Sequence, residues 1–272
     1  VWRITRVTHN DVEVSPAEAR PGIFPFWRAE EHRDFHFSEK IAAFLERAED
    51  RLDDPDFAAE LRESYFMDDA AAEELIAFLK RQREATRSGL PHRHHLLIEH
   101  FDDPANATGK KQVILHTLWG GRINRPLALA LSAAWKRKYG YNLETTITGD
   151  CVMLMLPHEF SARDLFTLVT PENIEELLRL GLEATGFFGA RFRENAGRAL
   201  LLPRASFGRR LPLWLNRLRA KKLMNAVLSY PDFPILLETW RTCLRDEFDL
   251  ENLRILLEEL RAGEIQIGEA IT

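Results

Sequence analysis

The chain has 272 residues, of which 45% are hydrophobic and 29% charged, and a formal net charge of −5. This composition excludes a disordered chain, and because no long apolar run or charged-then-apolar leader is seen, we expect a globular protein with no membrane partner. The two cysteines, Cys151 and Cys243, lack metal-type spacing, which favours a reducing compartment and predicts a cytoplasmic location.

The first residues predict short β-strands. The segments WRITRV and DVEVS flank the turn-like THN, and PGIFPFWRAEE follows them. Because two or three strands do not fold alone, we predict that residues 1–33 end a β-rich, barrel-like module and that residues 34–272 form an α+β domain. Trp27 lies in the proline-containing segment, where it could stack on a base, dock on a partner or fill the seam between two domains.

Helical periodicity begins at Ser38 and continues to Leu52. Asp54-Pro55 then supplies a cap and a first-turn proline for a second helix. A third helix is predicted from about Asp69 to near Gly89. Each of these helices is amphipathic, with one apolar face and one polar face exposed to solvent.

The centre of the chain predicts a ββαββ unit. HHLLIEHF and KQVILHTLW read as one pair of strands, and LETTIT and CVMLML read as another pair joined by Gly149-Asp150. Between the pairs we expect a helix capped by Asn124, with Pro126 in its first turn and an apolar surface nearly all round. The predicted fold is therefore a mostly helical domain around a small antiparallel sheet.

After Ser161 the pattern is mostly helical, with helices opened by Pro212, Pro234 and Asp249. The last residues, GEIQIGEAIT, allow one more short strand.

One basic segment stands out from the acidic remainder. Residues 191–222 contain ten Arg or Lys and one acid, Glu194, so this stretch carries +9 and the rest of the chain −14. In a helix that starts near Pro212, one face carries four residues spaced four, three and four positions apart: Arg210, Trp214, Arg217 and Lys221. Cations with an aromatic plane between them suit single-stranded nucleic acid, although such a Trp is more often buried in the core.

A second candidate site is HTLWGGRINRP, residues 116–126. Two glycines and Arg122 precede a helix N-terminus, which is a plausible seat for a phosphate. The alternative is a tight turn in which Trp119 closes the core.

Other chemistries find little support in the sequence. His92 and His94 could share a strand face at a zinc-binding spacing, but no carboxylate or cysteine has a complementary position, so we predict no metal site. The chain also lacks a GxxxxGK[ST] phosphate loop, GxGxxG, GxSxG and HExxH, and no catalytic residue is predicted.

The chain resembles the DEAD/H-associated region of the Lhr (large helicase-related) family of ATP-dependent helicases. The resemblance covers nearly the whole chain and is carried by GIFPFWRAE, by VILHTLWGGRINRPLALALSAAW, and by NAGRALLLPR followed by RRLPLWLNRLRAKKLMNAVLSYPDFPILLETWRTCLRDEFDLENLRILLEEL.

This resemblance implies a chain that follows two RecA-like motor domains and a winged helix. The implied parent uses ATP and Mg to move 3′ to 5′ along single-stranded DNA, unwinds duplexes including RNA–DNA hybrids, and serves DNA repair. ATP and Mg would belong to the motor, so no cofactor is expected in this chain.

The resemblance further implies a tryptophan that faces the strand, a role we assign to Trp27. The chemistry of the residues adds the other candidates, and the alternative is a structural brace for the motor without contact to nucleic acid. The predicted nucleic-acid-binding residues are Trp27, Arg28, Trp119, Arg122, Arg209, Arg210, Trp214, Arg217, Arg219, Lys221 and Lys222.

Overall fold

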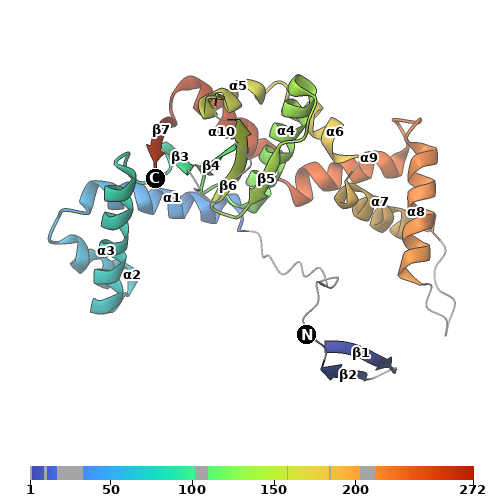
Figure 1. Cartoon of the computed structure of the whole chain (residues 1–272), viewed down its shortest axis with the longest axis horizontal. Helices are drawn as coiled ribbons and strands as arrows, with labels where there is room; N and C mark the ends of the chain where they lie inside the picture. Colours follow the sequence, from blue (N-terminus) through green and yellow to red (C-terminus); the bar gives the residue numbers. More distant parts are fainter. Residues whose placement is uncertain are drawn as a thin grey trace. The chain divides into compact units, whose positions relative to one another are not determined.

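The fold is known from a computed structural model of the whole chain (Figure 1). The structure describes residues 2–8, 11–16, 33–101, 110–157, 159–183, 185–202 and 212–272. The chain divides into two compact units, residues 1–31 and 32–272. Each unit is described by itself.

The first unit contains a β-hairpin. The two predicted strands are present as β1 (Trp2–Val7) and β2 (Val12–Pro16), and they pair antiparallel. The Thr8 hydroxyl accepts a hydrogen bond from the Asp11 backbone N–H at 2.9 Å and closes the turn. None of the described residues of this hairpin is buried. A lone hairpin with exposed apolar side chains is only marginally stable in water. The β-rich module predicted around it is not tested by the described residues and stays a prediction.

The second unit begins with three helices and a small core of their own. They are α1 (Phe35–Arg51), α2 (Phe57–Tyr65) and α3 (Asp69–Thr86). Asp34 and Asp68 cap α1 and α3 by accepting hydrogen bonds from backbone N–H groups. The prediction that Asp54 caps α2 is wrong, because the cap position is Asp56, two residues later. The Asp54 carboxylate instead accepts a hydrogen bond from the Asp56 N–H and pairs with Arg51 in the turn before α2.

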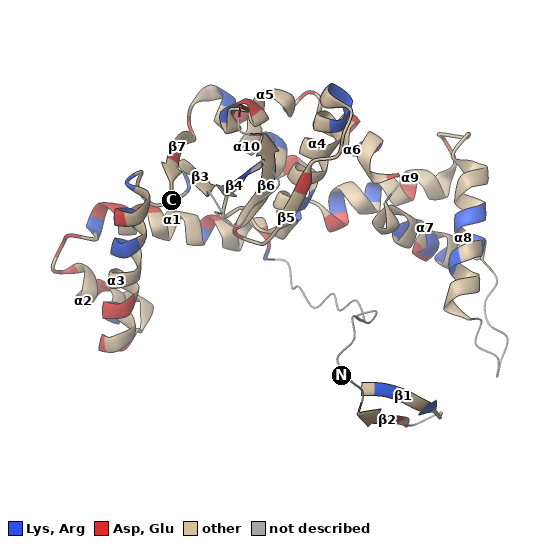
Figure 2. Cartoon of the chain, in the orientation of Figure 1, with Lys and Arg blue, Asp and Glu red and all other residues tan. Residues whose placement is uncertain are grey.

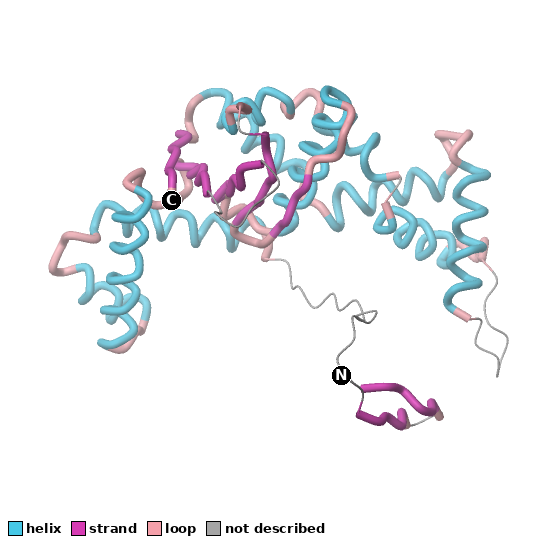
Figure 3. Tube along the Cα trace, viewed as in Figure 1, coloured by secondary structure: helices cyan, strands magenta, loops and turns pink. Residues whose placement is uncertain are grey.

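A five-stranded mixed sheet forms the centre of this unit (Figure 3). Its strands are β3 (His95–Phe101), β4 (Lys110–His116), β5 (Glu144–Ile147), β6 (Cys151–Pro157) and β7 (Gln266–Ile271), in the order β5-β6-β4-β3-β7. The four central-region strands are antiparallel, as predicted, and the predicted α+β fold is confirmed. The C-terminal segment adds β7 parallel to β3, which makes the sheet mixed.

Helix α4 (Gly121–Tyr139) packs on the sheet and shares one core with it. The prediction that Asn124 caps this helix is wrong, because the helix begins three residues earlier after Gly120. Gly120 has φ +85°, and a Cβ there would lie 2.6 Å from the Arg33 carbonyl oxygen, so glycine is required. Pro126 lies inside the helix, and the Arg122 carbonyl left free by the proline accepts from the Asp249 N–H at 3.1 Å.

The remaining helices extend the core away from the sheet. They are α5 (Leu165–Leu168), α6 (Ile174–Leu182), α7 (Gly186–Arg198), α8 (Leu213–Val227), α9 (Pro234–Arg241), the π-helical turn η2 (Thr242–Glu247) and α10 (Leu250–Ala262). Asp249 caps α10 through the Asn252 N–H, as predicted, and Gly263 ends the helix with φ +78°. Helices α7, α8 and α9 lie together at the end of this unit that carries the basic segment (Figures 1 and 2).

Candidate nucleic-acid interface

Helix α8 carries the basic face that the sequence predicts. Pro212 precedes the helix, and no glycine or proline interrupts Leu213–Val227. Ala220, Met224 and Val227 are buried at helical spacing and join the main core. This packing fixes the rotation of α8 and turns its other faces outward.

The described cations of α8 lie on its exposed faces. Figure 2 shows α8 with basic segments and no acidic one. These cations are all exposed and make no ion pair with any residue that the structure describes: Arg217, Arg219, Lys221 and Lys222. Cations can bind an external anion only if the protein's own carboxylates do not neutralise them. Within the described residues, the cations of α8 meet this condition.

The basic residues of α7 behave differently. The Arg191 guanidinium lies 2.7 Å from a Glu194 carboxylate oxygen and 2.9 Å from one of Glu247. Arg198 pairs with the other Glu194 oxygen at 2.7 Å. The positive charge counted along residues 191–222 is thus partly neutralised on α7, whereas on α8 no described carboxylate pairs with it.

Trp214 is an exposed aromatic residue at the start of α8. Its side chain is 66% exposed, so the alternative that it fills the core is wrong for this chain. Leu213 and Leu218 beside it are also exposed. Trp214 lies one turn before Arg217, which places an aromatic plane next to a cation on one face.

In the second predicted site, Trp119 is buried and Arg122 is half-buried. Trp119 is only 6% exposed and packs in the main core, so no ring face is free for a base, and the prediction that it binds nucleic acid is corrected. Arg122 Nη2 donates to the backbone carbonyls of Arg245 at 3.1 Å and Asp246 at 2.8 Å. Arg122 therefore connects α4 to the end of η2 through hydrogen bonds within the chain. The prediction that Arg122 binds a phosphate is corrected accordingly.

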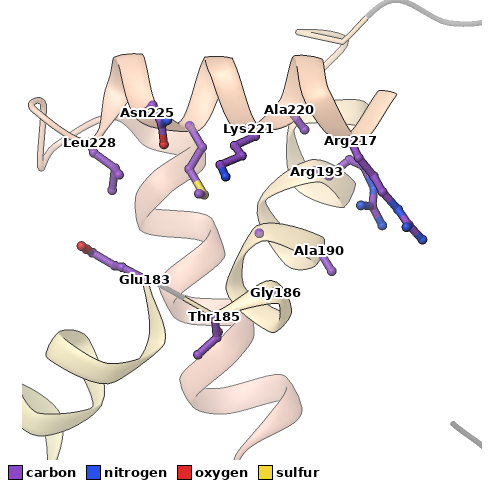
Figure 4. Close-up of a pocket in the computed structure, with 12 residues that line it drawn as sticks. Glu183, Thr185, Gly186, Ala190, Arg193, Arg217, Ala220, Lys221, Asn225 and Leu228 are labelled. Carbon is purple, nitrogen blue, oxygen red and sulfur yellow. The ribbon is translucent and has the colours of Figure 1, made fainter. Parts of the chain in front are cut away.

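Helices α7 and α8 border a groove with a volume of about 850 Å³ (Figure 4). Arg217 and Lys221 line it from α8, and Arg193 lines it from α7. Arg193 makes no ion pair with the described part of the chain. Sequence reasoning counted Arg193 in the basic segment but did not select it, because its position opposite α8 depends on how two helices pack.

Four predicted residues, Trp27, Arg28, Arg209 and Arg210, lie outside the described residues. Their assignment stays a prediction.

At the histidine-rich start of the strand, two histidines contact the carboxylate of Glu46. His94 Nδ1 lies 2.6 Å from Glu46 Oε1, and His92 Nδ1 lies 3.6 Å from the same oxygen. Burial lowers the pKa of His92, against the pull of Glu46. Across the described ranges, no three His, Cys, Asp or Glu side chains are arranged to hold a metal ion. Nor does any described helix have the length and apolar character to span a bilayer.

Comparison with known proteins bears on the whole chain. The family described as DEAD/H associated matches residues 90–272. Over its full length the chain is 34% identical to a protein named Lhr helicase/uracil glycosylase from Escherichia coli, and 36% identical to an Lhr helicase/probable uracil glycosylase from Mycolicibacterium smegmatis. It covers 17% and 18% of those two proteins.

A solved structure is similar as well. It is that of the Mycobacterium smegmatis helicase Lhr bound to ssDNA and AMP-PNP, and it matches with a TM-score of 0.76 and 34% identity over 93% of this chain and 32% of that chain. The ATP-dependent helicase Lhr-Core protein 2 of Thermococcus barophilus is 30% identical over 95% of this chain, which covers 30% of that protein. The chain thus spans less than a third of each of these relatives, and the predicted resemblance is confirmed.

Proposed function

The chain belongs to the DEAD/H-associated family, and we propose that it is the accessory single-strand-binding region of an Lhr-type ATP-dependent helicase. In this role it helps to hold one strand while the motor of the same polypeptide moves 3′ to 5′ and unwinds the duplex. The observation that carries the proposal is the set of exposed cations on α8, which make no ion pair with the residues that the structure describes. Similarity to proteins named as Lhr helicases, and to a helicase structure solved with ssDNA, supports it.

The chemistry of α8 suits the backbone of a single strand. Arginine and lysine neutralise phosphates and release counterions, which supplies most of the affinity of sequence-independent binding. An exposed aromatic side chain adds stacking with a base, at about 1–3 kcal/mol. We assign that contact to Trp214, which is exposed, and phosphate binding to Arg217 and Lys221, which line the groove.

ATP binding and hydrolysis, with Mg, are assigned to the RecA-like domains of the parent protein. None of the described residues is given a catalytic role. The partners proposed for this chain are single-stranded DNA or one strand of an RNA–DNA hybrid, and the motor and winged-helix domains of the same polypeptide.

The second candidate function is a structural brace for the motor. Leu213, Trp214 and Leu218 are exposed apolar side chains on one end of α8, and such a patch also suits a protein surface. In that case the cations would flank a protein contact and would add little to DNA affinity.

Fluorescence polarisation with a labelled single-stranded oligonucleotide separates the two functions. We expect the wild-type chain to bind and the double variant Arg217→Glu plus Lys221→Glu to lose most of its affinity. The matched control is Lys40→Glu plus Lys136→Glu, which reverses two exposed cations outside α8 and should bind like the wild type. Equal affinity of the wild type and the α8 variant would reject α8 as the binding surface.

A further inference from the structure

We propose that the phosphate backbone of the bound strand lies in the groove between α7 and α8, held by Arg193, Arg217 and Lys221. This inference rests on the proposed function and makes it more specific. It adds a residue of α7 to the site, and it divides the cations of α8 into two that face the strand and two that do not.

The direction of the α8 side chains separates its cations. The α8 residues that line the groove run from Arg217 through Lys221 to Asn225 at helical spacing, so they form one helical face. Arg219 and Lys222 are exposed but do not line the groove. A strand lying in the groove would therefore meet Arg217 and Lys221 and miss their two neighbours.

The charge around the groove favours an anionic ligand. Arg193 on α7 and Arg217 on α8 extend in the same direction at one end of it, and Lys221 extends from α8 into the same space (Figure 4). Among the described lining residues the single carboxylate is Glu183, which is exposed. Like charges that share one groove repel each other unless an anion lies between them. A phosphodiester is the anion that the proposed function supplies.

The floor of the groove on α7 is made of small residues. Gly186, Gly189 and Ala190 line it. A Cβ added at Gly186 or Gly189 would meet no neighbouring atom within 4 Å, so packing within the chain does not require glycine there. Glycine inside a helix costs about 1 kcal/mol relative to alanine. Close approach of a ligand backbone is a physical reason for leaving this floor bare.

The test compares two pairs of cations on the same helix. The groove pair is Arg217→Gln plus Lys221→Gln, and the outer pair is Arg219→Gln plus Lys222→Gln. Both variants lose the same charge from exposed positions, so thermal melting should show that both stay folded. Affinity for a short fluorescein-labelled oligothymidylate is measured by polarisation at several salt concentrations.

We expect the groove-pair variant to bind roughly tenfold more weakly or worse. The slope of log association constant against log salt should become shallower by about 1.4, that is about 0.7 for each lost phosphate contact. Arg193→Gln should lower the slope by a further 0.7 or so. The outer pair should leave the slope near the wild-type value. Equal losses from the two pairs would overturn the groove and leave the proposed function standing, whereas a wild-type chain that does not bind would overturn both.

A variant of unchanged charge makes the test independent of electrostatics. Gly189→Leu fills the floor of the groove and should weaken binding several-fold while the melting temperature stays the same or rises, because leucine favours the helix. Gly197→Leu is the matched control, since Gly197 lies on the same helix, has no neighbour within 4 Å of an added Cβ and does not line the groove. Unchanged binding by Gly189→Leu would contradict a strand in the groove.

A last arm asks whether the groove takes free phosphate. We expect sodium phosphate to displace the oligonucleotide no better than sodium chloride of the same ionic strength. Stronger displacement by phosphate would assign the site to a small anion and overturn the strand assignment.

Discussion

Replacing Arg122 should destabilise the fold and leave binding of a single strand unchanged. The side chain ties the start of α4 to the end of η2 through hydrogen bonds to the carbonyls of Arg245 and Asp246. These are carbonyls at a helix end, which otherwise lack intrahelical partners. Arg122→Ala removes both bonds.

The size of the effect follows from this geometry. A net hydrogen bond contributes about 1 kcal/mol, so the loss of two costs about 2 kcal/mol. Arg122 Nε is buried without a hydrogen-bond partner among the described residues, an unfavourable arrangement that any shorter or apolar side chain relieves. Both variants remove this Nε, but Arg122→Met also keeps much of the packing, so we expect it to cost about 1 kcal/mol, half the cost of Arg122→Ala.

Differential scanning fluorimetry and polarisation titration check this prediction together. In a domain of this size each kcal/mol shifts the melting temperature by about 2–4 °C, so Arg122→Ala should melt about 4–8 °C lower. Arg219→Ala is the matched control, because it removes the same charge from an exposed position and should not change the melting temperature. A drop in oligonucleotide affinity with an unchanged melting temperature would refute the tether and restore Arg122 as a phosphate ligand.

Four further outcomes are expected. Asn124→Leu should lower the free energy of unfolding, measured in urea, by about 2–3 kcal/mol. The buried Asn124 amide donates hydrogen bonds at 3.0 and 3.3 Å to two carbonyls of the β5–β6 turn, and leucine would remove both bonds. An unchanged free energy of unfolding would contradict this role. Phe66→Gly should raise stability by about 1 kcal/mol, because Phe66 is 90% exposed with φ +55°, whereas Phe66→Ala, which keeps the strain, should give no such gain. A hydrogen bond from Arg261 lowers the pKa of Glu172 to about 2, below its ordinary 4.5. The stability that this pair contributes above pH 4.5 should therefore be lost as the pH falls from 4.5 to about 2. Arg261→Met should flatten this pH dependence of the melting temperature. Burial raises the pKa of the Cys243 thiol to about 12, so native protein should leave it unlabelled by iodoacetamide and urea should expose it; labelling without urea would show that this part of the core opens.

The sequence predicted most elements because their signals are local. The start of α3 near Asp69, the cap of α10 and the strands joined by Gly149-Asp150 each depend on residues close together in the chain. The start of α4 was missed because two requirements competed. Asn124 is a good cap residue, but the buried contacts of its amide and the close approach at Gly120 determine the structure.

Long-range pairing explains the rest of the difference. The parallel contact of β7 with β3 joins residues near 95–100 to residues 266–271, and no local pattern specifies that register. The same limit applies to the candidate site. The sequence identified the cations of α8, but burial of Trp119, exposure of Trp214 and the place of Arg193 opposite Arg217 all depend on how helices and sheet pack.

The most direct measurement is a crystal structure of this chain with a bound oligothymidylate. We expect phosphates in the groove between α7 and α8, within hydrogen-bond distance of Arg193, Arg217 and Lys221, with a base near Trp214. A strand bound elsewhere, with this groove empty, would contradict the proposed site.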